Sequence, residues 1–439
     1  MSRGLVIAAP ASGSGKTLIV MGLARALTRR GLTVRVAKSG PDFIDPGFHA
    51  AAAGAAAINL DAWAMRRETL LSLAAGMEAE ADIVLCEGAM GLFDGAGPGG
   101  EAGSTAELAL LTGWPVVLAI DVRGQSASVA ALARGFAGHR PDLPLAGLIL
   151  NRAGGTGHQA VLREALGRAL PDLPILGMIQ RRADLVLPER HLGLVQAAEH
   201  DDLEALIGRA ADAMEEGIDI PRLLALASPG LSCPAPVSPP VPPLGQRIAI
   251  AHDTAFAFAY PAMLAGWRAA GAALSFFSPL ADEAPEPEAD AVFLPGGYPE
   301  LHAGTLAAAA NFKKGLGLSA SCGAAIYGEC GGYMVLGEGV IDAEGRRHEM
   351  AGLLPLVTSF AERRLHLGYR EVRLAAAAPL GAEGSRFRGH EFHYSRIVAE
   401  GPSPSLFQAT DARGGEIGRM GLVRGRVMGS FLHLIDRRD

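Results

Sequence analysis

Short apolar runs alternate with longer stretches of helical pattern over the first half of the chain. The runs are rich in Val, Ile and Leu, are almost uncharged, and fall at residues 5–9, 34–37, 83–86, 116–122, 145–150 and 175–179. The segments between them are rich in Ala, Leu and Arg. Strands that are apolar on both faces are typical of a parallel sheet covered by helices, so the pattern predicts βα units around a mostly parallel sheet.

A proline-rich segment interrupts this pattern. Residues 227–246 read ASPGLSCPAPVSPPVPPLGQ and contain no charged side chain, which is typical of an extended linker rather than of a packed element. Beyond it we expect strands at 247–253, 274–280 and 291–300, a helix at about 260–270, a strand leading into YGECGGYM and a closing strand in VMGSFLHL. The sequence therefore predicts two unlike α/β domains, at residues 1–226 and 247–439, joined by a linker at 227–246.

The composition excludes several classes of protein. Hydrophobic residues make up 49% of the chain and charged residues 19%, which argues against disorder. A net charge of −7 and an aromatic content of 5% argue against a nucleic acid as partner. No apolar run approaches the about 18 residues of a membrane span, and MSRGLVIAAPASGSGKT reads as a buried first strand rather than as a signal peptide. We expect a cytoplasmic protein without membrane contact, whose four cysteines, lacking zinc spacing, are reduced thiols.

A glycine-rich loop follows the first expected strand and precedes a helical pattern. In such a loop backbone N–H groups face phosphate oxygens, a lysine reaches the β and γ phosphates, and a hydroxyl binds Mg²⁺. Pro10 stands where GxxxxGKT has its first glycine, and the alternative is an ordinary βα turn. The strand–loop–helix context favours a nucleotide site. Its expected residues are Ser12, Gly13, Ser14, Gly15, Lys16 and Thr17.

Acidic and basic side chains follow the neighbouring strands. Asp45, Glu87 and Asp94 lie in KSGPDFIDP and CEGAMGLFDG, where an open parallel sheet places its ligands. Carboxylates facing a phosphate loop suit Mg²⁺, although each alone would read as a solvated turn residue. Lys38 is a candidate cation near the γ-phosphate, with a surface lysine as the alternative. Asn151 is a candidate for reading the adenine edge, although Asn-Arg is also good turn chemistry.

A candidate nucleophile, Cys330, lies in the second domain. Its segment GECGG has the Gly-x-nucleophile-x-Gly form of a sharp strand-to-helix turn. At a helix N-terminus the dipole would stabilise the thiolate. The alternative for Cys330 is a buried core thiol. Cys322 precedes the strand and lacks this turn geometry, so we interpret it as structural.

A thiol that attacks an amide needs oxyanion donors and a base. The backbone N–H groups of Gly297, in LPGGYPE, and of Gly331, next to the cysteine, are the expected donors. The base should be a histidine on a later strand. His433 at the end of the last apolar run competes with His390 and His393 of GHEFHYS, and spacing alone does not separate the three.

Seven ordered segments carry a family resemblance. ASGSGKT, KSGPDFIDP, CEGAMGLFDG, LPERHLGL, LPGGYPE, YGECGGYM and GHEFHYS resemble the cobyrinic acid a,c-diamide synthase family, including its hydrogenobyrinic acid branch. The resemblance runs from about residue 4 to residue 435 and covers both expected domains. It implies a dethiobiotin-synthetase-like P-loop domain with a parallel sheet, fused to a class I glutamine amidotransferase-like α/β domain.

The resemblance also implies roles for single residues. Cys330 would be the glutaminase nucleophile and His433 its base, which resolves the choice among the three histidines. One position departs from the wider class I pattern: the glutamate that normally follows the histidine by two residues is Ile435 here. The site therefore resembles a Cys–His dyad, in which the group that orients His433 is not identified from the sequence. In the first domain, the positions that correspond to the nucleotide, metal and catalytic residues are Thr17, Asp45, Glu87 and Asp94.

The activity that the resemblance implies is ATP- and glutamine-dependent amidation of the a and c acetate carboxylates of cobyrinic or hydrogenobyrinic acid, in cobalamin biosynthesis. ATP would activate each carboxylate as an acyl phosphate, with Mg²⁺ as cofactor, and ammonia released from glutamine would form the amide. The expected partners are thus ATP, glutamine and a corrinoid polycarboxylate. Because ammonia is lost to solvent, we expect the domains to shelter its route.

The sequence allows two alternative functions and does not decide between the metal-free and the cobalt-containing corrin substrate. One alternative is amidation of another tetrapyrrole, such as Ni-sirohydrochlorin, by the same chemistry. The other is a partitioning-type ATPase whose glutaminase module is degenerate, which the intact GECGG segment argues against. The choice of the metal-free over the cobalt-containing corrin rests on no single residue. Domains resembling dethiobiotin synthetase often pair, so a homodimer is the expected alternative to a monomer.

Overall fold

The computed structural model describes residues 3–187, 189–190, 193–231 and 238–438. The chain forms two compact units, of which unit 1 comprises Met1–Trp63 and Arg67–Val237, and unit 2 comprises Ala64–Arg66 and Ser238–Asp439. Among the described helices, none combines the length and apolar character that crossing a membrane requires.

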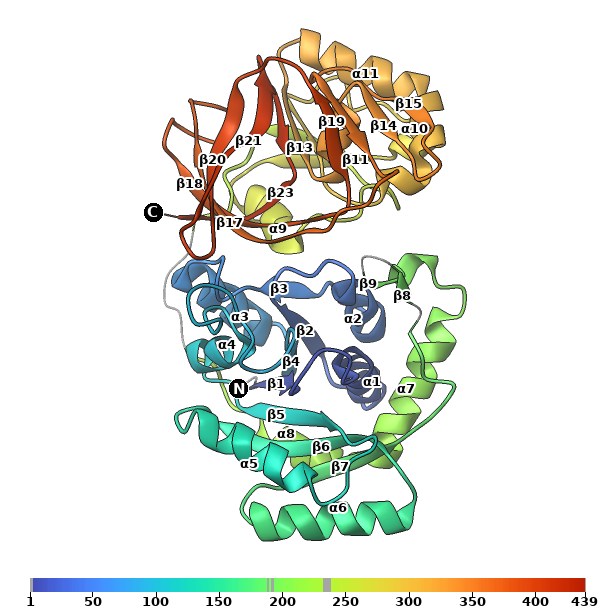
Figure 1. The fold of residues 1–439 in the computed structure, drawn as a ribbon, viewed down its shortest axis with the longest axis vertical. Helices are drawn as coiled ribbons and strands as arrows, with labels where there is room; N and C mark the ends of the chain where they lie inside the picture. Colours follow the sequence, from blue (N-terminus) through green and yellow to red (C-terminus); the bar gives the residue numbers. More distant parts are fainter. Residues whose placement is uncertain (1–2, 188, 191–192, 232–237, 439) are drawn as a thin grey trace. The chain divides into compact units, whose positions relative to one another are not determined.

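Unit 1 is built from alternating strands and helices (Figure 1). In chain order they are β1 (Arg3–Ala8), α1 (Lys16–Arg29), β2 (Val34–Ser39), α2 (Asp45–Ala53), β3 (Ile58–Leu60), α3 (Arg67–Ala79), β4 (Ile83–Glu87), α4 (Thr105–Thr112), β5 (Val116–Asp121), α5 (Val129–His139), β6 (Leu145–Ala153), α6 (Thr156–Ala169), β7 (Ile175–Gln180), β8 (Glu189–Arg190), β9 (Gly193–Leu194), η1 (Ala197–Glu199), α7 (Leu203–Gly217) and α8 (Ile220–Leu226). In the LPERHLGL segment, residues 188, 191 and 192 lie outside the described residues.

The main sheet of unit 1 is parallel throughout, which confirms the predicted fold class. Its order is β3-β2-β4-β1-β5-β6-β7. The six strands expected from the apolar runs are all present, and the short edge strand β3 is an addition. β4 is buried along its whole length and β1 along all but its first residue. Because helices cover both faces, the central strands carry apolar side chains on both sides.

Helices cover the two faces of this sheet in separate groups. α1 packs against α2 and α7, and α3 packs against α4. Figure 1 shows α1, α2 and α7 on one side of the strands and α3 and α4 on the other. In this doubly wound arrangement the carboxyl ends of β1, β2 and β4 meet at one edge, where ligands of open parallel sheets bind.

Unit 2 begins in the same way and ends as an antiparallel structure. Its elements are β10 (Arg247–Ala251), α9 (Pro261–Ala269), β11 (Ala273–Phe277), η2 (Pro279–Ala281), β12 (Ala291–Leu294), η3 (Pro299–His302), α10 (Ala303–Ala308), α11 (Ala310–Ser321), β13 (Ala325–Glu329), α12 (Gly331–Leu336), β14 (Gly339–Ile341), β15 (Arg347–Glu349), β16 (Leu356–Ser359), β17 (His366–Leu374), β18 (Arg386–His393), β19 (Arg396–Glu400), β20 (Ser405–Asp411), β21 (Glu416–Arg424), β22 (Val427–Ser430) and β23 (Leu432–Arg438).

The large sheet of unit 2 has the order β11-β10-β12-β13-β22-β21-β20-β17-β18-β23. The first five strands are parallel and include the strands expected from the sequence. The expected closing strand is divided at Phe431 into β22, which pairs with β13, and β23, which pairs with β18. The antiparallel strands β17, β18, β20 and β21 were not anticipated. They bring the GHEFHYS segment, far from Cys330 in sequence, into the same sheet.

The segment expected to be a linker includes packed residues. Ser228 bridges to Gly4 of β1. Val241 and Leu244 are buried, and the Val241 carbonyl accepts a hydrogen bond from Trp267 Nε1 at 3.0 Å. Residues 232–237, in the middle of the segment, lie outside the described residues. The uncharged proline-rich ends of this segment thus attach to the units that they join, unlike the extended segment that the composition suggested.

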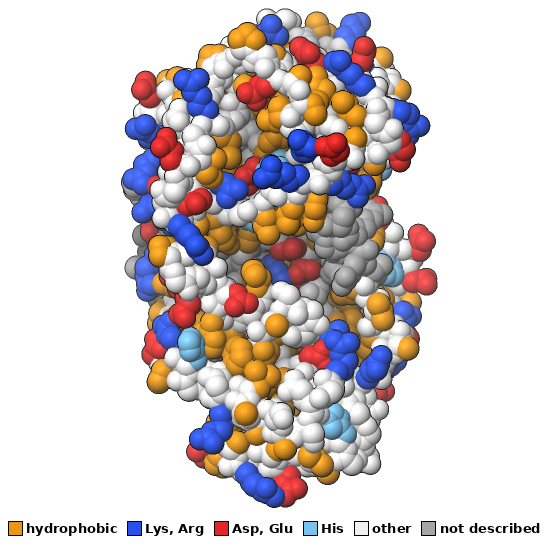
Figure 2. All heavy atoms as spheres, viewed as in Figure 1, with side chains coloured by type: hydrophobic (Ala, Val, Ile, Leu, Met, Phe, Trp, Pro, Cys, Tyr) orange, Lys and Arg blue, Asp and Glu red, His pale blue; other side chains and the backbone are white. Residues whose placement is uncertain are grey.

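The surface charge is mixed in sign. In the view of Figure 2, Lys and Arg side chains are interspersed with Asp and Glu over each unit.

Substitution of Gly177 in β7 would test how tightly unit 1 is packed. A methyl group on Gly177 would lie 2.2 Å from the Gly217 carbonyl oxygen, whereas one on Gly135 in α5 would meet nothing within 4 Å. We expect Gly177→Ala to lower the free energy of unfolding by about 1–3 kcal/mol because backbone must move. Gly135→Ala, by removing a helical glycine, should raise it by about 0.8–1.0 kcal/mol. Denaturant unfolding measures both, and equal stability of the two variants would contradict the packing described here.

Candidate active sites

The phosphate loop of unit 1 connects β1 to α1. Gly13 and Gly15 have φ of +74° and +89°, in the left-handed region that favours glycine. A methyl group on Gly15 would lie 2.4 Å from Asn151 Nδ2. This amide nitrogen donates a hydrogen bond to the Ser14 carbonyl at 2.8 Å. Asn151, expected at the adenine edge, thus also supports the loop itself.

Lys16 and Thr17 begin helix α1. The Lys16 ammonium donates hydrogen bonds to the Met90 carbonyl at 2.6 Å and to the Ala11 carbonyl at 3.3 Å. Burial lowers the pKa of Lys16 to about 8. Its charge is therefore poorly compensated by the surrounding protein groups, which favours binding of an anion.

A cluster of charged side chains lies at the ends of β2 and β4. Lys38 Nζ is 2.5 Å from Asp45 Oδ2 and 3.0 Å from Glu87 Oε1. Thr17 Oγ1 donates to Glu87 Oε1 at 2.8 Å, and His49 Nε2 is 2.5 Å from Glu87 Oε2. The structure thus brings together Thr17, Lys38, Asp45 and Glu87, all singled out in the sequence.

Mutual attraction dominates the ionisation of this cluster. Burial alone would lower the pKa of Lys38, but Asp45 and Glu87 raise it well above its ordinary value. Burial alone would raise the pKa of Glu87, but Lys38, His49 and Thr17 hold it below its usual range. Both side chains are therefore charged at neutral pH, as a buried pair must be if each is to offset the desolvation of the other.

Asp94 lies beside the same loop. Its Oδ2 accepts a hydrogen bond from the Gly91 amide at 2.8 Å, and a methyl group on Gly91 would lie 2.6 Å from both Asp94 Oδ2 and the Pro10 carbonyl oxygen. Asp94 is exposed, in contrast to Glu87. Its carboxylate is thus accessible next to the start of the phosphate loop.

Cys330 of unit 2 stands between β13 and α12. Its φ of +47° and ψ of −104° lie where non-glycine residues are rare. The Cys330 amide donates to the Ser430 carbonyl at 2.8 Å. A methyl group on Gly332 would lie 1.9 Å from the Leu294 carbonyl oxygen, so only glycine fits there. Strain of this kind costs about 1–3 kcal/mol and is typical of functional sites.

The thiol of Cys330 is only 3% exposed, and burial raises its pKa above the ordinary value. Glu300 adds to the effect. The expectation that the helix N-terminus would favour the thiolate is therefore not met, because desolvation exceeds the effect of a helix of six residues. A thiol of this kind needs a base before it can attack an amide.

His433 borders the same space as Cys330. A methyl group on Gly296 would lie 2.3 Å from His433 Cε1, 3.1 Å from His433 Nε2 and 3.2 Å from Cys330 Cβ. Burial, followed by His390 and His393, lowers the pKa of His433 to about 3. The neutral imidazole is the form that accepts a proton.

The two competing histidines occupy different places. His390 lies opposite His433 in the pairing of β18 with β23, and burial lowers its pKa to about 4. The His393 ring stacks on Phe431 with centroids 3.9 Å apart. Its ring nitrogens contact Glu391 Oε1 at 3.1 Å and Ser395 Oγ at 3.0 Å. The geometry around Gly296 therefore favours His433 as the base.

The two glycines expected to form the oxyanion site are neighbours. A methyl group on Gly331 would lie 3.1 Å from the backbone nitrogen of Gly297. A methyl group on Gly297 would lie 2.0 Å from the Ala255 carbonyl oxygen, so this position also requires glycine. The two positions are thus close together, and the amides of Gly297 and Gly331 stay the candidates for the oxyanion site.

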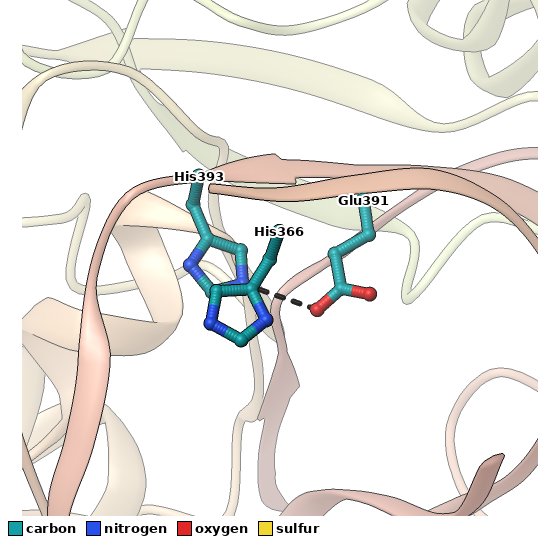
Figure 3. A group of neighbouring side chains, drawn as sticks. All are labelled: His366, Glu391 and His393. Atoms are coloured by element: carbon teal, nitrogen blue, oxygen red, sulfur yellow. Dashed lines mark hydrogen bonds and ion pairs between the residues drawn. The ribbon is translucent and has the colours of Figure 1, made fainter. Parts of the chain in front are cut away.

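Three side chains near this site resemble a metal-binding group (Figure 3). His366 of β17 and Glu391 and His393 of β18 offer ligand atoms within 4.8 Å of one another. However, the His366 and His393 rings are stacked, with centroids 4.7 Å apart and an angle of 5°. Ring nitrogens bind a metal in the plane of the ring, so two parallel stacked rings do not aim at one ion. Glu391 Oε2 is also 2.7 Å from Arg370 Nη2. In this conformation the group is a hydrogen-bonded cluster and not a metal site.

Two buried side chains that the sequence did not single out, His49 and Glu329, contact the site residues. His49 lies one turn after Asp45 on α2, a spacing that places both on one face of the helix. Glu329, 1% exposed, directly precedes Cys330. The signal was present in both cases, an ionisable residue beside a motif, but only the fold shows that each is buried against a functional group.

Comparison with known proteins agrees with the two units. Residues 5–195 match the CobQ/CobB/MinD/ParA nucleotide binding domain family, and residues 247–439 match the CobB/CobQ-like glutamine amidotransferase domain family. The hydrogenobyrinate a,c-diamide synthase of Rhodobacter capsulatus is 56% identical over 437 residues, which cover 99% of this chain and 98% of the relative. That of Rhizobium meliloti is 53% identical over 438 residues, 99% of each chain.

These matches span both units and confirm the resemblance seen in the seven segments. They also agree with the parallel sheet of unit 1 and with the cysteine at the strand-to-helix turn of unit 2. The chain therefore belongs to the hydrogenobyrinate a,c-diamide synthase family of glutamine-dependent, amide-forming ligases, in which a nucleotide-binding domain and a glutamine amidotransferase domain share one polypeptide.

Proposed function

We propose that this chain amidates the a and c acetate carboxylates of hydrogenobyrinic acid, using ATP and glutamine. The observation that carries the proposal is that one chain, 56% identical over 437 residues to a hydrogenobyrinate a,c-diamide synthase, holds a lysine and acid cluster beside a phosphate loop and a strained cysteine beside a neutral histidine. The first set of groups suits activation of a carboxylate, and the second suits release of ammonia.

The first half-reaction takes place in unit 1. A substrate carboxylate oxygen attacks the γ-phosphorus of ATP, an acyl phosphate forms and ADP leaves. The loop from Ser12 to Gly15 binds the phosphates through its backbone, and Lys16 and Lys38 neutralise charge on the transferred group. Asp94 is the exposed carboxylate available to contact the reacting groups. Asn151 is proposed to act through the loop that it holds, and its contact with the adenine edge stays a prediction.

Mg²⁺ is the proposed cofactor of this site. Thr17 Oγ1, Glu87 and Asp45 offer the oxygen donors that this ion prefers, and the 2.8 Å contact between Thr17 Oγ1 and Glu87 Oε1 shows that two of them converge. These three residues would hold the ion, which would supply charge neutralisation for the phosphates. Lys38 contacts both of these carboxylates, those of Asp45 and Glu87.

The second half-reaction takes place in unit 2. His433 Nε2 takes the proton of Cys330, and the sulfur attacks the side-chain amide carbon of glutamine. The amides of Gly297 and Gly331 donate hydrogen bonds to the oxyanion. His433 returns the proton to the leaving nitrogen, which departs as ammonia and leaves a thioester. Water, deprotonated by His433, then releases glutamate. Ammonia attacks the acyl phosphate, and an amide and inorganic phosphate form.

The remaining expectations concern substrate, assembly and location. The names of the relatives support a metal-free corrin over a cobalt-containing one. We propose a cytoplasmic enzyme whose partners are small molecules, and pairing of two chains remains a prediction that sedimentation analysis would test.

Removing the nucleophile should separate the two nitrogen sources. We expect Cys330→Ala to abolish glutamine-dependent product formation, since no thioester can form, and to leave ammonia-dependent amidation within twofold. Mass gain of hydrogenobyrinic acid with ATP and Mg²⁺ measures both reactions. Cys322→Ala, at the exposed thiol, is the matched control and should retain both. Loss of both activities in Cys330→Ala would contradict this division of labour.

Removing the ammonium group of Lys38 should stop amidation with glutamine and amidation with ammonia alike. We expect Lys38→Met to lower amidation about 100-fold or more with either nitrogen source, because phosphoryl transfer precedes both. Lys314→Met, at an exposed lysine of α11, is the control and should behave as the parent protein. Glutaminase activity measured without ATP should survive in both variants. Retention of ammonia-dependent amidation in Lys38→Met would argue against the role of Lys38.

A further inference from the structure

The orientation of His433 is the unexplained part of the glutaminase site. In class I amidotransferases a carboxylate two residues after the histidine holds the second ring nitrogen. Here that residue is Ile435, an apolar side chain that is 4% exposed. It can neither accept a hydrogen bond from His433 Nδ1 nor stabilise a positive imidazole.

A carboxyl group reaches this nitrogen from another strand. Glu329 Oε2 is 3.8 Å from His433 Nδ1, and Glu329 Oε1 accepts a hydrogen bond from the Leu434 amide at 3.0 Å. The second contact anchors the carboxyl group to the strand that carries the histidine. Glu329 is the last residue of β13 and directly precedes the nucleophile. Strand β13, which leads into Cys330, thereby also places the carboxyl group of Glu329 next to His433.

The burial of Glu329 is costly unless the charge serves a purpose. The side chain is 1% exposed, and the basic side chain found beside it within the described ranges is His433. Glu87, another buried carboxylate of the chain, has Lys38 beside it instead. A buried carboxyl group whose cationic partner is an imidazole becomes favourable when that imidazole takes a proton.

We infer that Glu329 is the positioning residue of the glutaminase site, replacing the third member of the triad and orienting His433 so that Nε2 is the proton acceptor for Cys330. The inference rests on the proposed roles of Cys330 and His433. As sulfur gives its proton to Nε2, the Nδ1–H of the imidazolium faces the Glu329 carboxylate. No bond to Glu329 forms or breaks in this step.

The pKa of Glu329 sets the pH range in which its carboxylate form is available for this role. Burial raises the pKa of Glu329 to about 8, although the Leu434 amide and Tyr327 act to lower it. The titratable groups that face His433 from β18 are His390, His393 and Glu391. Because the carboxylate form of Glu329 increases as the pH rises through about 8, glutaminase kcat should rise over the same range.

Glu329→Gln separates the charge of this residue from its shape. The amide oxygen of glutamine can still accept from the Leu434 amide, but the side chain no longer carries a negative charge. We expect glutaminase kcat to fall about 100-fold or more, the KM for glutamine to stay within twofold, and the rise of kcat near pH 8 to disappear. Ammonia-dependent amidation should stay within twofold, which would show that unit 1 is folded, and the unchanged KM would show that unit 2 still binds glutamine.

A conservative variant and a spectroscopic measurement complete the test. Glu329→Asp should recover at least tenfold in kcat over Glu329→Gln because it restores the carboxylate. Two-bond ¹H–¹⁵N spectra of ¹⁵N-histidine-labelled protein, with His433→Gln for assignment, should show the Nδ1–H tautomer in the parent and a changed tautomer population in Glu329→Gln.

Two results would overturn the inference. One is a glutaminase kcat within threefold of the parent in Glu329→Gln. The other is loss of ammonia-dependent amidation together with glutaminase activity, which would mean that Glu329 supports the fold alone. Cys330→Ala, assayed in parallel, keeps the proposed function distinguishable: if that variant still consumes glutamine, the glutaminase roles fail, whatever Glu329→Gln does.

Discussion

At the carboxyl ends of the parallel strands in both units, a glycine packs so closely against a neighbouring group that no side chain fits between them. In unit 1 a methyl group on Gly15 would lie 2.4 Å from Asn151 Nδ2, and in unit 2 one on Gly332 would lie 1.9 Å from the Leu294 carbonyl oxygen. These contacts fix the phosphate loop and the turn that carries Cys330. A backbone N–H group that is already fixed in position loses little entropy when it donates a hydrogen bond to a substrate. Such contacts therefore favour binding of substrate groups by backbone amides.

Both sites bury ionisable groups, but the ionisation of these groups is controlled differently in the two sites. Around Lys38 the opposite charges of Lys38 and Glu87 keep both groups ionised, whereas burial raises the pKa of Asp45 to about 7. Around Cys330 burial instead holds the groups neutral, with the pKa of the thiol raised and that of His433 lowered. A charged lysine held by a carboxylate suits phosphate binding, whereas a neutral thiol and imidazole suit a proton transfer between them.

Several predictions differed from the structure in instructive ways. The closing strand VMGSFLHL is two strands, because the chain crosses at Phe431 from the parallel part of the sheet to the antiparallel part. The effect of the helix N-terminus on Cys330 was overestimated, because sequence shows the helix but not the desolvation. The supposedly extended linker packs at Val241 and Leu244, although proline-rich composition suggests an unpacked chain. In each case a contact between segments distant in sequence decided the outcome.

The sequence by itself determined the features that depend on near neighbours along the chain. Apolar runs predicted the strands of the parallel sheets, and glycine spacing predicted the loop before Lys16 and the turn at Cys330, because strand period and backbone freedom are local properties. Residue spacing left three histidines as candidates for the base, and the family resemblance selected His433. Only the tertiary structure showed that His433 borders Cys330 and which acid lies next to it. His49 and Glu329 acquire their roles from burial against groups far away in the chain, and neither burial nor the resulting pKa can be computed from spacing. Ionisation depends on the whole surroundings of a group, and those surroundings exist only once the chain has folded.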